Sequence, residues 1–290
     1  MRRILPRTRS SRARRAGIGC RVMTSATDIQ RYHTAAVELA DEARRIITPA
    51  LERGFILKTK ADRSLVTEVD QAIERRAREL IDRWFPDHGV IGEEYPPTRP
   101  DSPFQWIIDP IDGTEEFVHG IPTFGTMLAL HLRGVPLVGV IDHAALDLRV
   151  DAGIGLGAFR NGQRIRLAQA VVDQHAEQVR LALSARINFT RQIDEGRLFE
   201  TLTRLYPNHR IYRAAYAHTA AVTGAVDAMV DMHNHVWDLA PSRVLIEEAG
   251  GVYEVVRDFP AADGARLLSA VFGKAAVVER LVAVFRASPV

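Results

Sequence analysis

The sequence contains a single cysteine, Cys20, among its 290 residues. One thiol excludes an intrachain disulfide framework and a cluster of several thiolates around a metal within one chain. The chain also lacks a Gly-x-x-x-x-Gly-Lys-[Ser/Thr] loop, so chemistry on nucleoside triphosphates has no recognisable phosphate cradle. No apolar run reaches the roughly 18 residues of a membrane span. We therefore expect no membrane partner and a cytoplasmic protein.

Acidic residues are absent from residues 1–22, which contain eight arginines. The formal net charge of +2 thus conceals a mildly acidic body that carries a basic arm. Because the arm has no apolar periodicity and its like charges repel, we predict that it is disordered. A mis-assigned start before Met23 is the favoured interpretation. A transit peptide and a nucleic-acid-binding arm stay open.

The remaining composition, 47% hydrophobic and 26% charged over the whole chain, allows one or two domains with a substantial core. Apolar spacing predicts an amphipathic helix over residues 27–53 and a second one that carries Ile73, Ala77 and Leu80. Short β-type runs with glycine turns between residues 106 and 167 predict an antiparallel sheet. Alternating strands and helices after residue 179 predict a second, mixed or mostly parallel sheet. We expect an N-terminal α+β domain over 23–175 and a C-terminal α/β domain over 176–290.

The most informative segment is Asp-Pro-Ile-Asp-Gly-Thr at residues 109–114. The apolar run before it predicts a buried strand that delivers Asp109, and Pro110 is expected to end that strand. The turn would let Asp109 and Asp112 converge with the carbonyl of Ile111, an oxygen set suited to a hard divalent cation.

A short helix over residues 114–119 is expected to follow, so that the amides of Gly113 and Thr114 could cradle an anion. Turn chemistry alone also accounts for this composition, so an ordinary surface turn stays open.

Two further aspartates are expected at helix starts. Asp70 would lie in the first turn of its helix, where it either favours the helix dipole or orients an attacking water beside Thr114. Asp238 is expected to begin a helix over residues 238–249, and an N-cap role does not exclude a role as a metal ligand.

In combination these segments resemble the inositol monophosphatase superfamily of Mg²⁺-dependent phosphomonoesterases. The resemblance extends from about residue 28 to the C-terminus. The matching motifs occur in order and are Val-Thr-x-x-Asp at 66–70, Gly-Glu-Glu at 92–94, Trp-Ile-Ile-Asp-Pro-Ile-Asp-Gly-Thr-x-x-Phe at 106–117, Trp-Asp-x-Ala-Pro at 237–241 and Glu-Ala-Gly-Gly at 248–251. The resemblance implies a layered αβαβα sandwich, of α+β and α/β character, and a homodimer.

The resemblance also implies two Mg²⁺ ions, with room for a weaker third ion near Glu94. The implied ligands of the first ion are Glu93, Asp109 and the Ile111 carbonyl, and those of the second are Asp109, Asp112 and Asp238.

In the mechanism that the resemblance implies, water attacks the phosphate in line and no phosphoenzyme forms. Asp70 and Thr114 would polarise that water, with Glu93 and Glu94 beside it. The amides of Gly113 and Thr114 would hold the phosphate oxygens.

The expected substrate is a small phosphate monoester. Residues 85–94, 124–130 and 139–142 resemble the histidinol-phosphate branch more than the inositol branch, but residues 212–218 match neither. We expect Tyr216, His218 and Asp231 to line the wall facing the leaving portion, and Asp231 could accept hydrogen bonds from an ammonium or a hydroxyl group. Inositol phosphate stays an alternative. So does a regulatory or RNA-interacting member of the fold with weak catalysis, although nucleic acid is not the expected partner.

Three other patterns have simpler explanations. The glycines of residues 153–157 predict a hairpin turn rather than a dinucleotide loop. A zinc site at His233 and His235 with His143 is disfavoured, because paired histidines are usually structural. Glu247 and Glu248 are expected to complete an exposed helix face.

Overall fold

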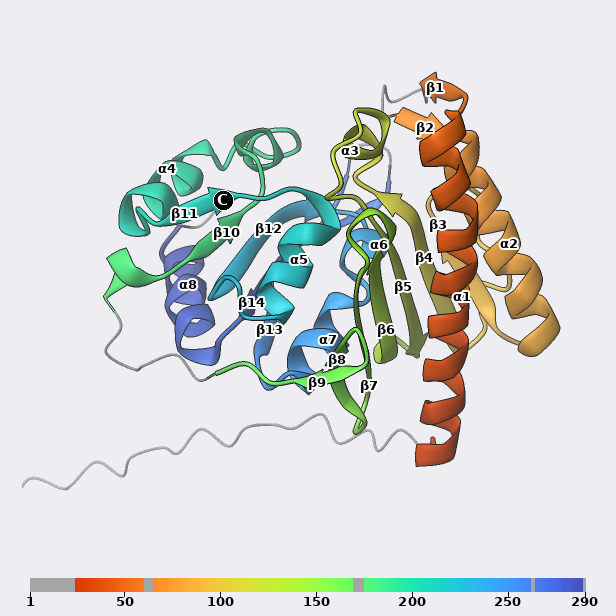
Figure 1. Cartoon of the computed structure of the whole chain (residues 1–290). Helices are drawn as coiled ribbons and strands as arrows, with labels where there is room; N and C mark the ends of the chain where they lie inside the picture. Colours follow the sequence, from red (N-terminus) through yellow and green to blue (C-terminus); the bar gives the residue numbers. More distant parts are fainter. Residues whose placement is uncertain (1–23, 60–64, 169–174, 262–263, 289–290) are drawn as a thin grey trace, which may run out of the picture.

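The computed structural model describes residues 24–59, 65–168, 175–261 and 264–288. Helices and sheets alternate in five layers, which confirms the expected αβαβα sandwich (Figure 1). The basic arm and residues 60–64 of the predicted polar loop lie outside the described residues. In the parts of the chain that are described, no helix is long and apolar enough to cross a membrane.

The first layer consists of α1 (Ala26–Arg53) and α2 (Glu68–Trp84), whose buried apolar faces pack on the first sheet. Both predicted helices are confirmed. Each begins with a capping box, in which Ser25 pairs with Asp28 and Thr67 pairs with Asp70. A short hairpin of β1 (Leu57–Thr59) and β2 (Leu65–Thr67) connects the two helices.

The second layer is a seven-stranded sheet in the described residues, in the order β3-β4-β5-β6-β7-β8-β9. Its strands are β3 (Gly89–Gly92), β4 (Phe104–Asp112), β5 (Gly125–Leu132), β6 (Val135–His143), β7 (Leu148–Gly153), β8 (Gly157–Arg160) and β9 (Gln163–Ile165). The antiparallel prediction holds from β4 to β9, and the glycine-rich turn between β7 and β8 is a hairpin. β3 differs, because it pairs in parallel with β4.

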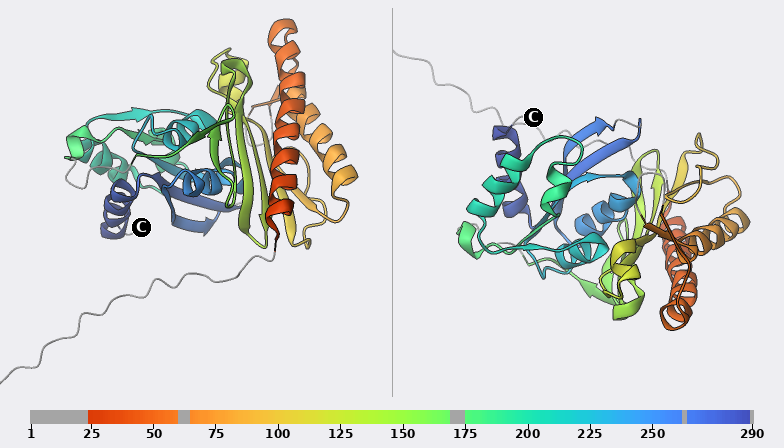
Figure 2. Two further views of the ribbon diagram at one scale, coloured as in Figure 1. Left: turned by 60° about the horizontal axis from the view of Figure 1, so that its bottom comes forward. Right: turned by 90° about the horizontal axis from the view of Figure 1, so that it is seen from above.

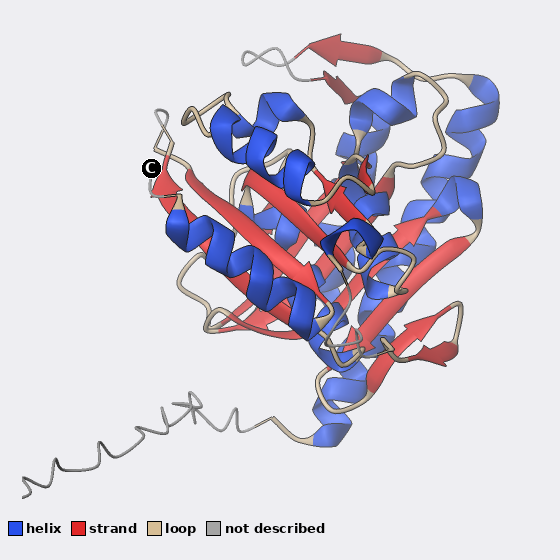
Figure 3. Cartoon of the chain, turned by 90° about the vertical axis from the view of Figure 1, so that its left-hand side faces the viewer, coloured by secondary structure: helices blue, strands red, loops and turns tan. Residues whose placement is uncertain are grey.

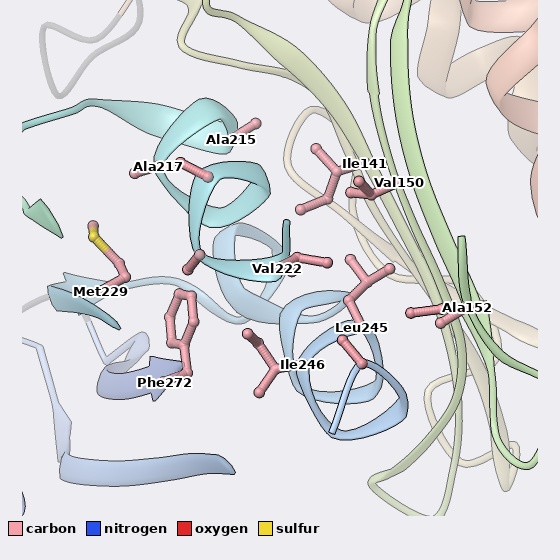
Figure 4. Packing of buried hydrophobic residues seen from close by; sticks show 14 of the residues in the cluster. Ile141, Val150, Ala152, Ala215, Ala217, Val222, Met229, Leu245, Ile246 and Phe272 are labelled. Carbon is pink, nitrogen blue, oxygen red and sulfur yellow. The ribbon is translucent and has the colours of Figure 1, made fainter. Parts of the chain in front are cut away.

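The third layer contains α5 (Ala214–Val222) and α7 (Ser242–Glu248), which lie between the two sheets (Figure 4). Leu245 of α7 lies on the side of Ile141 and Val150 of the first sheet, whereas Ile246 lies towards Phe272 of the second sheet. This apolar cluster joins the two halves of the chain into one packed body.

The fourth layer is the second sheet, in the order β11-β10-β12-β14-β13. Its strands are β10 (Leu181–Leu183), β11 (His209–Ile211), β12 (Ala228–Asn234), β13 (Val252–Pro260) and β14 (Arg266–Gly273). β10 is parallel to β11 and β12, whereas β14 is antiparallel to β12 and β13, so the sheet is mixed as expected. The division into two domains stays a prediction, although the change of sheet falls between β9 and β10.

The fifth layer is formed by α4 (Gly196–Leu205) and α8 (Ala275–Ala287), which cover the outer face of the second sheet (Figures 2 and 3). The alternation of side chains along β12 explains why this sheet is covered on both faces. Ala228, Val230 and Met232 face α4 and α8, whereas Met229 faces the layer between the sheets. A strand with two apolar faces requires helices on each side.

Candidate metal and phosphate site

Four carboxylates from three segments gather where the first sheet meets α6 (Val236–Leu239). Glu93 directly follows β3, Asp109 and Asp112 lie in the last part of β4, and Asp238 belongs to α6. Because β3 and β4 are parallel, Glu93 and Asp109 emerge at the same edge of the sheet, and α6 packs against β4. The structure therefore brings together side chains that lie 145 positions apart in the sequence.

Burial and the neighbouring negative charges raise the pKa of three of these carboxyls, those of Asp109, Asp112 and Asp238. Burial is the first cause for Asp109, followed by the negative charge of Glu93, and its pKa lies well above the usual range. Burial and then Asp238 raise the pKa of Asp112 in the same way. The pKa of Asp238 rises to about 8, again through burial and then Glu93, although part of its surface reaches solvent.

A hard divalent cation fits this group by its chemistry. All the donors are oxygens, which Mg²⁺ prefers, and a cation would relieve the mutual repulsion. Asp109 is 2% exposed, and its Oδ1 atom accepts no hydrogen bond from the described residues. Nowhere in those residues do three His, Cys, Asp or Glu side chains already form a closed set of ligands. Mg²⁺ does not require one, because it commonly keeps several waters and binds through one or two carboxylates together with phosphate oxygens.

Pro110 does not end the strand, contrary to the sequence expectation. β4 continues through it to Asp112, and the pairing with β5 shifts register between Asp109 and Asp112. The Thr126 hydroxyl donates to the Pro110 carbonyl at 2.8 Å. A proline can remain in a strand at such a bulge because no ladder hydrogen bond is needed from its nitrogen.

Asp70 and Thr114 lie side by side, as expected. Asp70 Oδ2 accepts from the Thr67 amide at 2.8 Å, which completes the cap of α2, while Oδ1 lies 3.4 Å from the Thr114 hydroxyl. That hydroxyl is closer to the Ile111 carbonyl, at 3.1 Å. Burial is the main cause that raises the pKa of Asp70, and its hydrogen bonds to Thr67 oppose the rise. The capping contacts with Thr67 and the contact with Thr114 are thus both present.

Gly113 turns the chain into the expected short helix, α3 (Thr114–Val118). Its φ of 90° lies in the left-handed region that glycine adopts at little cost. This turn places the Gly113–Thr114 segment directly beyond Asp112, at the edge of the carboxylate group.

Asp238 does not begin a continuous helix over 238–249. It is the third residue of α6, and its Oδ2 accepts from the His235 amide at 2.8 Å. The predicted helix is divided at Ala240 and Pro241 into α6 and α7, since proline lacks an amide donor and disfavours helical geometry in the residue before it.

Asp231 lies near the carboxylate group, where its charge contributes to the raised pKa of Asp112 and Asp238. His218 is 2% exposed and lies behind it, with Nε2 at 2.7 Å from Asp231 Oδ2 and Nδ1 at 2.6 Å from the Ser242 hydroxyl. A carboxylate can only accept, so we assign the proton to Nε2. His218 therefore supports Asp231 and does not line an open wall.

Tyr216 is half-buried, and its ring packs edge-on against Tyr212 and His143.

The zinc alternative has no geometric support from the histidines themselves. His143 bonds the Phe124 carbonyl and Thr219, while His233 faces Glu195 at 3.1 Å.

Two glutamates have roles that the sequence motifs did not indicate. Glu248 does not simply face solvent, because its carboxylate accepts from the amides of Gly155 and Gly157 at 2.8 and 2.9 Å. Glu74 is fully buried and accepts from the Glu94 amide at 2.7 Å. Its position four residues after Asp70, on the same helix face, was the available signal.

Comparisons with known proteins agree with this architecture. The model of the inositol monophosphatase family matches residues 28–265. A histidinol-phosphatase from Mycobacterium tuberculosis is 36% identical over 219 residues, covering 75% of this chain and 83% of that protein. An inositol-1-monophosphatase from Bacillus subtilis is 30% identical over 243 residues, covering 82% and 89%. The structure of an inositol monophosphatase from Anabaena superposes with a TM-score of 0.74 at 26% identity, covering 90% of this chain and 98% of that one.

The family match and these relatives thus identify a phosphoric monoester hydrolase, as expected from the motifs. The chain belongs to the inositol monophosphatase family.

Proposed function

We propose that this protein is a Mg²⁺-dependent phosphatase of a small phosphate monoester, with histidinol phosphate as the first candidate substrate. The observation that carries the proposal is the convergence of Glu93, Asp109, Asp112 and Asp238 at one edge of the first sheet. The Mycobacterium relative supports the histidinol phosphate candidate, and the Bacillus relative supports inositol phosphate as the second.

We propose for these residues the roles that the family resemblance implies. Glu93, Asp109, Asp112, Asp238 and the Ile111 carbonyl would hold two ions, and Glu94 lies beside them. Bound Mg²⁺ supplies positive charge that activates water and stabilises the leaving oxygen. Asp70 and Thr114 would orient the attacking water, and the Gly113 and Thr114 amides would hold the phosphate.

Asp231 is proposed to face the leaving portion of the substrate, because it lies near Asp112 and Asp238 and is held there by His218. An acceptor in this position suits an ammonium or hydroxyl group. Tyr216 is proposed to border the same wall. A cytoplasmic location and a homodimer stay predictions.

The test is turnover of a panel of phosphate monoesters, including histidinol phosphate and inositol phosphate, with Mg²⁺ and with a chelator. We expect Asp109→Asn to lower kcat/KM by more than about 100-fold for every substrate, because an amide cannot replace a carboxylate between two cations. Asp101→Asn, at an exposed aspartate before β4, is the matched control and should behave like wild type.

Near-normal turnover in Asp109→Asn would contradict the metal assignment. Negligible wild-type turnover, together with salt-sensitive binding of polyanions, would instead favour the regulatory alternative. That alternative is based on residues 1–22, which lie outside the described residues.

A further inference from the structure

Glu74 has no place in the proposed chemistry, yet it lies fully buried in α2 beside the Glu93–Glu94 segment. Both oxygens of its carboxylate accept hydrogen bonds. Oε2 accepts from the Glu94 amide at 2.7 Å, and Oε1 accepts from Arg78 Nε and Nη2 at 2.8 and 2.7 Å. A buried carboxylate is costly to desolvate, and these hydrogen bonds to both oxygens offset part of that cost.

Gly92 shows how closely the strand end approaches this carboxylate. A Cβ atom added at Gly92 would lie 2.1 to 2.6 Å from the Glu74 carboxylate atoms. With glycine at this position the last residue of β3 lies against Glu74, whereas a Cβ atom would force either the Glu74 carboxylate or the strand end to shift. The residue that follows Gly92 is the proposed ligand Glu93.

Arg78 extends the attachment to the residues after Glu94. Its Nη2 atom donates to the Tyr95 carbonyl at 3.1 Å, and its guanidinium lies 5.9 Å from the centre of the Tyr95 ring. Asp70, Glu74 and Arg78 follow at intervals of four, so they share one face of α2.

We propose that Glu74, supported by Arg78, is a positioning residue that fixes the Gly92–Tyr95 segment so that Glu93 can bind metal. One helix face then places the water-orienting Asp70 and holds the segment that carries a metal ligand. This inference depends on the proposed metal-dependent function, but it concerns metal affinity rather than substrate identity. Groups that orient metal ligands commonly contribute 10- to 100-fold to metal affinity.

The experiment compares Glu74→Ala, Glu74→Gln, Gly92→Ala and Glu79→Ala in the full chain. Glu79 is the matched control, a glutamate of the same helix whose side chain is 57% exposed. The first readout is the Mg²⁺ concentration that gives half of the metal-induced rise in melting temperature. The second is the Mg²⁺ concentration for half-maximal turnover.

In both readouts we expect Glu74→Ala to raise the half-saturating Mg²⁺ concentration about 10- to 100-fold, while kcat at saturating Mg²⁺ changes by less than about threefold. Glu74→Gln keeps an acceptor for the Glu94 amide but turns its NH2 group towards Arg78, so its half-saturating Mg²⁺ concentration should lie between those of wild type and Glu74→Ala. Gly92→Ala disrupts the same contact from the side of the strand, whichever of the two groups moves, so it should reproduce the loss of affinity even if Glu74→Ala folds poorly. Glu79→Ala should not differ from wild type.

Wild-type Mg²⁺ affinity in a folded Glu74→Ala or Gly92→Ala variant would overturn the proposal, even if the metal-free melting temperature fell. A wild-type protein that binds Mg²⁺ but hydrolyses no phosphate monoester would contradict the proposed function. In that case the melting readout still decides the role of Glu74.

Discussion

At the scale of single residues, the buried carboxyl groups lower the stability of the fold that contains them. These groups belong to Asp109, Asp112 and Asp238. Burial and mutual repulsion raise the pKa of each carboxyl, to about 8 for Asp238. The folded protein without metal therefore retains protons that the unfolded chain releases near the ordinary value of 3.8. Function and stability make opposite demands on these side chains.

This conflict predicts a pH-dependent stability. Since the folded state binds more protons, the free energy of unfolding should fall as pH rises towards 8. Buried His88 and His131, whose pKa is lowered to about 4, act in the opposite direction, but only below their ordinary value of 6.5. Between pH 6.5 and 8, in chelator, the melting temperature should therefore decrease.

The measurement is thermal unfolding at both pH values for wild type and Asp238→Asn, with and without Mg²⁺. The decrease should be smaller in Asp238→Asn, which cannot ionise, and smaller in wild type with saturating Mg²⁺, which neutralises the carboxylates. Equal slopes in all three conditions would show that the carboxyls do not titrate in this range.

Asp231 should control selectivity rather than catalysis. Asp231→Asn removes the charge that would pair with a substrate ammonium, but it keeps a hydrogen-bond acceptor for a hydroxyl. We expect kcat/KM for histidinol phosphate, relative to inositol phosphate, to fall by about ten- to a hundredfold, equivalent to about 1.4 to 2.8 kcal/mol. The measurement is a comparison of the two substrates, and the half-saturating Mg²⁺ concentration of Asp231→Asn should stay within about threefold of wild type. An unchanged ratio would place the leaving portion elsewhere.

At the scale of elements, polar contacts help to join neighbouring layers. Glu248, the last residue of α7, accepts from two amides in the turn between β7 and β8. The contact joins the middle helix layer to the first sheet across more than 90 positions of sequence. Since the acceptor is ionised, each bond should contribute more than a neutral hydrogen bond.

Glu248→Ala should therefore destabilise the protein by about 1 to 3 kcal/mol, because it leaves the Gly155 and Gly157 amides without their acceptor. The control is Glu247→Ala. The carboxylate of Glu247 forms a half-exposed ion pair with Arg243, which should contribute at most about 1 kcal/mol to the free energy of unfolding. Denaturant unfolding of both variants gives the comparison. A smaller loss for Glu248→Ala than for Glu247→Ala would exclude the layer contact as a stabilising one.

For the whole molecule, the five layers account for the described fold without the basic arm. α1 begins at Ala26 and is capped by Ser25, so the first element has its own start signal after Met23. Its buried face packs against the first sheet.

A variant that begins at Met23 should have the melting temperature and specific activity of the full chain, within experimental error, because it retains the cap and every described layer. Thermal unfolding and turnover at saturating Mg²⁺ are the measurements. A marked loss in either would show that the arm contacts the body or contributes to the site.

Local sequence determined much of this protein. Apolar spacing predicted α1 and α2, and the run before Asp109 predicted β4, because these patterns depend on residues a few positions apart. The motifs by themselves also indicated the acidic residues of the site.

Tertiary structure decided what those residues meet. The parallel pairing of β3 with β4 brings Glu93 to Asp109, and the packing of α6 on β4 adds Asp238. The sequence likewise did not reveal that Glu74 contacts Gly92 or that Glu248 accepts from the β7–β8 turn, since these partners are distant in sequence. Periodicity specifies which face of an element is apolar, whereas the close packing of the layers selects the polar groups that are buried together.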